Sequence, residues 1–125
     1  MLFTDTEKTA LLKVATDMMT IDGILHDKEL DLYSLQFARL GCTPNEVWNM
    51  LEASKVMDEN DILIILSSMS VNKKKYASGF LSTLMKIDGD IDESEMRLWK
   101  EINEKCGFPL MTFSEATEFW YSNFK

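Results

Sequence analysis

Two short acidic segments with the same spacing are the parts of this sequence that could do chemistry. Asp22 and Glu29 belong to the first segment, and Asp88 and Glu95 belong to the second. Carboxylate oxygens are the ligands that hard divalent cations such as Ca²⁺ and Mg²⁺ prefer. If each segment is the turn of a helix-loop-helix, its two carboxylates come together where the chain folds back. The spacing therefore suggests a pair of divalent-cation sites.

The same acids also have an ordinary structural interpretation. Each aspartate precedes a glycine, which permits the backbone conformation of a tight turn. Glu29 and Glu95 stand three residues after His26 and Asp92, the place where a capping box puts its reciprocal glutamate. Asp92 is a good helix N-cap and His26 is a poor one. Metal ligation and helix capping both stay open at this point.

The second segment must be distinguished from an EF-hand. Asp88, Asp90 and Asp92 have the spacing that opens an EF-hand calcium loop. Glu93 then occupies the position of the required glycine, and Trp99 occupies that of the bidentate glutamate. The segment is therefore not an EF-hand. Asp90 and Asp92 are extra candidate ligands in the second segment alone, so the two sites need not be equivalent.

Catalytic motifs find little support in the sequence. His26 is the single histidine, which excludes an HExxH zinc motif and any multi-histidine metal centre. Neither a GxSxG motif nor a P-loop occurs. We expect no catalytic residues and no enzyme, and a metal-dependent, carboxylate-only hydrolase is the one catalytic alternative.

Composition limits the class of protein. The chain has 125 residues and a net charge of -8, which favours one domain and disfavours binding to the phosphate backbone of nucleic acids. Neither a secretory signal nor a transmembrane segment is visible, so a cytoplasmic location is expected. Cys42 and Cys106 are expected to be buried thiols, with a redox pair as the alternative.

Apolar residues at helical spacing predict an all-α fold, a compact bundle of about seven helices. Capping boxes that begin at Thr4, Thr43 and Thr112 predict three helix starts, and Gly41 and Gly107 predict two helix ends. Residues 62–66 are apolar on every side of a helix, which predicts that the fourth helix lies at the centre of the bundle. The fifth helix is expected after a break near residues 71–72.

The two acidic segments belong to an internal repeat. Residues 19–23 match residues 85–89, and the match continues without gaps to Gly41 and Gly107. We expect a single domain over residues 1–125, with one repeat unit over about 5–56, a linking helix over about 60–71 and a second unit over about 73–125. Two such units packed face to face would be related by a pseudo-twofold axis.

The repeated pattern resembles the TerB-like tellurite-resistance family, whose relatives include the N-terminal domain of a membrane-anchored DnaJ-type co-chaperone. It is carried by Ile21-Asp22-Gly23 with Leu25 and Glu29, and by Ile87-Asp88-Gly89 with Ile91 and Glu95. The resemblance covers about residues 7–107. It implies a helical fold and a divalent-metal site, Ca²⁺ or Mg²⁺, built from Asp22, Glu29, Asp88 and Glu95.

The resemblance also implies a bacterial cytoplasmic protein of stress or tellurite-type resistance that works through protein partners, often near the membrane. We therefore expect an accessory or adaptor module that binds a divalent cation. The alternative from another class is a helical scaffold for protein-protein interaction in which the acids serve only as caps.

Two further clusters could contact a partner. Lys73-Lys74-Lys75 is the one basic cluster, and the preferred interpretation is a solvated face. Trp120, Tyr121 and Phe124 are expected to dock the last helix onto the bundle, because large apolar residues at helical spacing usually belong to the core. A contact with acidic lipid or a partner protein is the alternative for the lysines, and an exposed partner site is the alternative for the aromatic residues.

Overall fold

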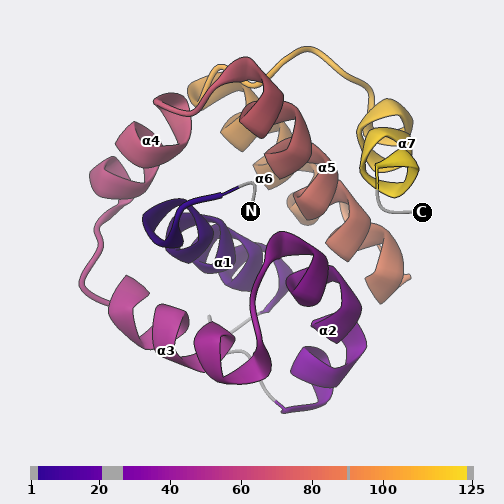
Figure 1. The fold of residues 1–125 in the computed structure, drawn as a ribbon. Helices are drawn as coiled ribbons and strands as arrows, with labels where there is room; N and C mark the ends of the chain where they lie inside the picture. The colour runs from indigo at the N-terminus through magenta and orange to yellow at the C-terminus, as the bar shows by residue number, and fades with distance from the viewer. Residues whose placement is uncertain (1–2, 21–26, 90, 124–125) are drawn as a thin grey trace.

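The computed structural model describes residues 3–20, 27–89 and 91–123, and these residues form α-helices joined by turns and loops (Figure 1). The helices are α1 (Asp5–Met19), α2 (Asp27–Leu40), α3 (Pro44–Ser54), α4 (Glu59–Ser67), α5 (Val71–Asp88), α6 (Glu93–Lys105) and α7 (Phe113–Ser122). No strand occurs in these ranges. The predicted all-α bundle of seven helices is confirmed.

Side-chain caps fix where the helices begin. Thr4, Thr43 and Thr112 each accept the backbone N–H of a glutamate three residues on, and that glutamate accepts the N–H of the threonine in return. These three predicted capping boxes are confirmed. The fifth helix, by contrast, already begins at Val71 instead of after a break near residues 71–72, because the Ser70 hydroxyl accepts the Lys73 N–H at 3.2 Å.

The prediction that the fourth helix is central is wrong. In α4 only Ile62 and Leu66 are buried among the apolar run, and Ile64 is 64% exposed. The helix packs one face against α1 and turns the other outward. The apolar run includes residues such as Ile64 that lie outside this contact face, so a continuous apolar run did not indicate burial on every side.

The buried helix is instead α5, whose residues 77–85 are all buried. Phe80, Leu81, Leu84 and Met85 fill the core, while Ser82 lies among them with its hydroxyl donating to the Gly79 carbonyl at 3.0 Å. Small polar residues that bond within their own helix can be buried without an unpaired donor. Because of these polar residues, the sequence of α5 does not look like that of a central helix.

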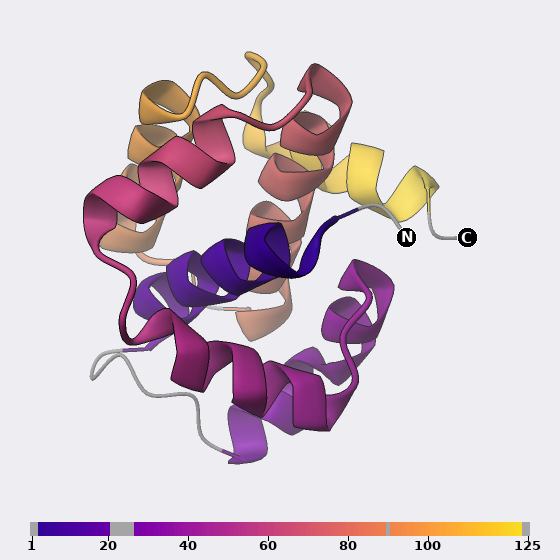
Figure 2. The ribbon, with the colours of Figure 1, turned by 60° about the vertical axis from the view of Figure 1, so that its left-hand side comes forward.

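The packing of the helices follows the repeat. In the first unit α1 packs against α3, and in the second α5 packs against α7. Across the units α2 packs against α5, whereas α6 packs against α1 (Figure 2). A pseudo-twofold axis would exchange partners in this way, and the axis itself stays a prediction.

Candidate functional site

The second acidic turn connects α5 to α6. Helix α5 ends at Asp88, and Gly89 follows with a φ of 81°, its N–H donating to the Lys86 carbonyl at 3.1 Å. Glycine is the residue that adopts this left-handed conformation without strain. The chain then enters α6 through Asp92, which has extended backbone geometry.

Asp92 is engaged in capping α6. One of its carboxylate oxygens accepts the Glu95 N–H and the Ser94 hydroxyl, each at 2.8 Å. The bond from the Glu95 N–H, followed by that from Ser94, holds the pKa of Asp92 below its ordinary value of 3.8. The N-cap predicted for this turn is confirmed at Asp92.

The two predicted glutamates occupy equivalent places in the fold. Glu29 lies in the first turn of α2 and Glu95 in the first turn of α6, and both side chains are half-buried. The Oε2 atom of Glu95 is shielded from solvent. Burial of a carboxylate oxygen disfavours its charge unless a proton, a donor or a cation compensates.

The remaining acids of the predicted sites are only partly described. Asp22, His26 and Asp90 lie outside the described residues, and for Asp88 the structure describes the backbone alone. Among the residues it describes, no three His, Cys, Asp or Glu side chains gather as a metal-binding group.

The lysine cluster is half-buried, which corrects its interpretation as a solvated face. Lys73 forms an ion pair with Glu7 at 2.8 Å, and Lys74 places its ammonium 3.6 Å from where a Cβ on Gly107 would stand. In the first unit Lys8, the repeat equivalent of Lys74, is 2% exposed and donates to the Gly41 carbonyl at 2.9 Å. A cation near the C-terminal end of a helix is favourable, and Lys8 and Lys74 lie at the C-terminal ends of α2 and α6.

Both cysteines are buried free thiols, as predicted. Burial raises the pKa of Cys42 to about 11 and raises that of Cys106 as well. The last helix docks as predicted, because Trp120 is fully buried and its indole N–H donates to Gln36 of α2 at 2.6 Å. Tyr121 is partly exposed, and Phe124 lies outside the described residues.

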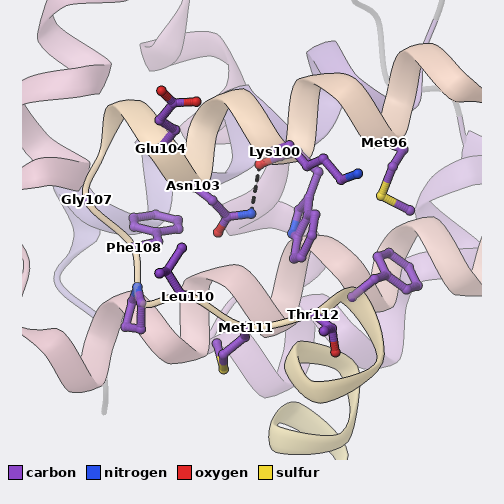
Figure 3. Close-up of a pocket in the computed structure, with 12 residues that line it drawn as sticks. Met96, Lys100, Asn103, Glu104, Gly107, Phe108, Leu110, Met111 and Thr112 are labelled. Atoms are coloured by element: carbon purple, nitrogen blue, oxygen red, sulfur yellow. Dashed lines mark hydrogen bonds between the residues drawn. The ribbon is translucent and has the colours of Figure 1, made fainter.

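An apolar pocket between α6 and α7 was not foreseen from the sequence. It has a volume of about 740 Å³ and is lined by one face of α6 and by residues 107–113 (Figure 3). A smaller pocket of about 500 Å³ lies between α2 and α3, where the repeat places the equivalent residues. The sequence signal that could have indicated the pocket is Leu110, a large apolar residue in the connection between two predicted helices, outside both helical patterns. In the structure its side chain is fully exposed.

No helix in the described ranges is long and apolar enough to cross a membrane. No protein-family model matches the sequence, and no curated protein matches it. The fold is similar to the crystal structure of PG1108, a protein of unknown function from Porphyromonas gingivalis W83, with a TM-score of 0.78 and 33% sequence identity. The similarity covers 97% of this chain and 92% of that one. Such identity over nearly the whole of both sequences shows that the chain belongs to the same family as PG1108.

Proposed function

We propose that the chain is a TerB-like accessory or adaptor module without catalytic activity, working in a bacterial stress or tellurite-type resistance system. In this proposal it binds a divalent cation, Ca²⁺ or Mg²⁺, through its acidic turns. The second turn, with Asp88 and Glu95, is the stronger of the two because Asp90 and Asp92 add to its negative potential.

The observation that carries the cation site is the burial of Glu95 Oε2 in the first turn of α6. A surface glutamate that serves only solubility keeps both oxygens in water. Here a carboxylate oxygen is withdrawn from solvent beside a turn that an aspartate and a glycine close. A cation held by Glu95 and Asp88 would add to the interactions that offset that desolvation.

A second candidate is a scaffold for protein-protein interaction in which the acids act only as caps. It is favoured by Asp92, whose hydrogen bonds are those of an ordinary N-cap. Both candidates predict an adaptor, and they differ in whether the folded chain takes up a cation.

Isothermal titration with CaCl₂ and with MgCl₂, combined with thermal unfolding, separates the two candidates. A cation that binds only the folded chain raises the free energy of unfolding, by about 2.7 kcal/mol at a hundred times its Kd. We expect heat of binding and a higher Tm. The absence of both up to millimolar cation would favour the scaffold.

Substitutions place the site. Glu95→Gln and Asp88→Asn should each abolish the cation-dependent rise in Tm, because an amide removes the charge. Glu115→Gln is the matched control, since Glu115 holds the same position in the first turn of α7 and belongs to a capping box. Retention of the full effect in Glu95→Gln would show that the cation lies elsewhere.

A further inference from the structure

The α6–α7 pocket is preformed, because hydrogen bonds and ring packing fix the residues that line it. Its floor is Trp99, whose indole N–H donates to the Ser78 carbonyl of α5 at 3.2 Å and whose ring meets that of Phe113 edge to face, with centroids 5.5 Å apart. Asn103 accepts the Ser78 hydroxyl and donates to the Trp99 carbonyl, both at 2.8 Å. Three helices hold this floor, so a ligand meets a surface that is already formed.

The polar groups of the floor are thus satisfied within the chain, and recognition there is apolar. The side chains facing the cavity include Met96, Phe108, Met111 and the fully exposed Leu110. Figure 3 shows α6 along one side and the segment from Gly107 to Thr112 along the other. A groove of this shape suits bulky apolar side chains from an extended or helical segment.

A longer connection accompanies the larger pocket of the second unit. In the first unit the N-cap Thr43 follows Gly41 by two positions, whereas in the second Thr112 follows Gly107 by five. The additional residues place Leu110 at the rim, where it is 103% exposed and contributes nothing to the core. Its side chain extends the apolar lining formed by Phe108 and Met111, and a contiguous apolar surface of this kind marks a contact site.

The charge around the pocket favours one class of ligand over the others. Two exposed charged residues, Lys100 and Glu104, line the pocket one helical turn apart, and neither forms an ion pair with any residue the structure describes. Acidic side chains outnumber basic ones on α6 and α7, and the whole chain carries a charge of -8. This field repels an anionic amphiphile and a second copy of the chain, and it attracts a basic segment.

From this geometry we infer that the α6–α7 pocket binds a basic amphipathic segment of a partner protein, with bulky apolar anchors on the Trp99 floor and a basic residue paired with Glu104. The inference rests on the adaptor role proposed above and deepens it by giving the chemistry of the partner. It does not require the cation site.

Selection from a displayed library of random peptides, about 12 residues long so as to span the i, i+3, i+4 and i+7 anchors of a helix, tests the inference. The full chain is the target, and Leu110→Asp is the counter-selection. Enriched peptides should combine aromatic or large aliphatic residues with Lys or Arg. The proposal would be overturned if no peptide were enriched on the unsubstituted chain relative to Leu110→Asp, or if the enriched peptides were acidic.

Calorimetry with one selected peptide then tests the placement of charge. Leu110→Asp should weaken binding about tenfold, whereas Val56→Asp, a matched control at an 88% exposed residue outside the pocket, should leave it unchanged. Glu104→Gln should weaken binding about threefold and Lys100→Gln should strengthen it. The reverse pattern would indicate an anionic ligand, and self-association lost in Leu110→Asp would indicate a second copy.

The same titration in EDTA keeps this inference separate from the cation proposal. Glu95→Gln should bind the peptide as the unsubstituted chain does, with or without cation. Uptake of cation without selection of any peptide would contradict only the pocket proposal. Selection of a peptide without uptake of cation would contradict only the cation-site proposal.

Discussion

At the scale of single residues, Glu7 shows that an acid of this chain can do more than one structural task. It completes the capping box of α1 with Thr4 and forms an ion pair with Lys73 of α5 at 2.8 Å. Burial by itself would raise the pKa of Glu7, but the Lys73 and Thr4 hydrogen bonds together with the Lys73 charge outweigh it and lower that pKa. A cap thus also ties the two repeat units together.

Lys73→Met tests this link. We expect it to lower the free energy of unfolding at pH 7 by about 1 kcal/mol, since the pair is half-buried. The folded-state pKa of Glu7 lies below its ordinary value of 4.5. The stabilisation is therefore complete above pH 4.5 and is lost as the pH falls through the lowered pKa.

Urea unfolding of both proteins at several pH values measures the difference, which should shrink in that acidic window. Lys55→Met is the control, because its pair with Glu52 is exposed on both sides and should contribute little. A constant difference at all pH values would mean that Lys73 acts through packing alone.

The acids of the candidate sites could be predicted from sequence only as far as their local roles. The cap at Asp92 follows from its spacing to Glu95, and the turn follows from Gly89. Whether carboxylates of a turn converge depends on side-chain positions that spacing does not determine. The pocket was missed because Trp99 and Phe113 have the same helical spacing as core residues.

At the scale of helices, the contact between α5 and α7 depends on Gly79. A Cβ added there would stand 2.7 Å from the Ala116 carbonyl oxygen and 3.0 Å from the Trp120 Cβ. Both neighbours belong to the buried side of α7 and cannot withdraw. Glycine is therefore required for the close approach of these two helices, although it weakens an isolated helix.

We expect Gly79→Ala to destabilise the protein by about 2 kcal/mol, because forced overpacking exceeds the gain of about 1 kcal/mol in helix propensity. Thermal and urea unfolding measure the change. Asn49→Ala, at an exposed position inside α3, is a control for substitution by alanine within a helix. An increase in stability for Gly79→Ala would contradict the packing described for α5 and α7.

Helix limits were predictable where caps determine them, and the place of a helix in the bundle was not. The apolar run of α4 suggested a central helix, yet Ile64 is exposed. Helix α5 is central despite Ser78, Ser82 and Thr83. The number of apolar residues in a helix does not reveal that small polar residues can be buried with them. Ser82 donates to a carbonyl of its own helix, and Ser78 donates to Asn103 of α6.

At the scale of the whole molecule, the two repeat units exchange contacts and form one core. Helix α2 packs on α5, and α6 packs on α1. The Trp120 indole N–H also reaches Gln36 of the other unit at 2.6 Å. Neither unit can lose its structure without exposing apolar surface of the other.

Unfolding should therefore be a single cooperative transition. In a Trp48→Phe variant, tryptophan fluorescence reports only Trp99 and Trp120 of the second unit, whereas far-UV circular dichroism reports all helices. The two urea curves should coincide. Two separate transitions would show that the units are independent domains.

The unequal connections after α2 and α6 bear on how such a fold acquires new functions. The segment around Leu110 projects from the bundle, so its length and sequence can change while the shared core stays intact. Extending a surface loop carries only a small entropic cost. In a repeated architecture, the length of one connection can therefore change while its counterpart stays a short turn, so a binding surface can be altered without rebuilding the core.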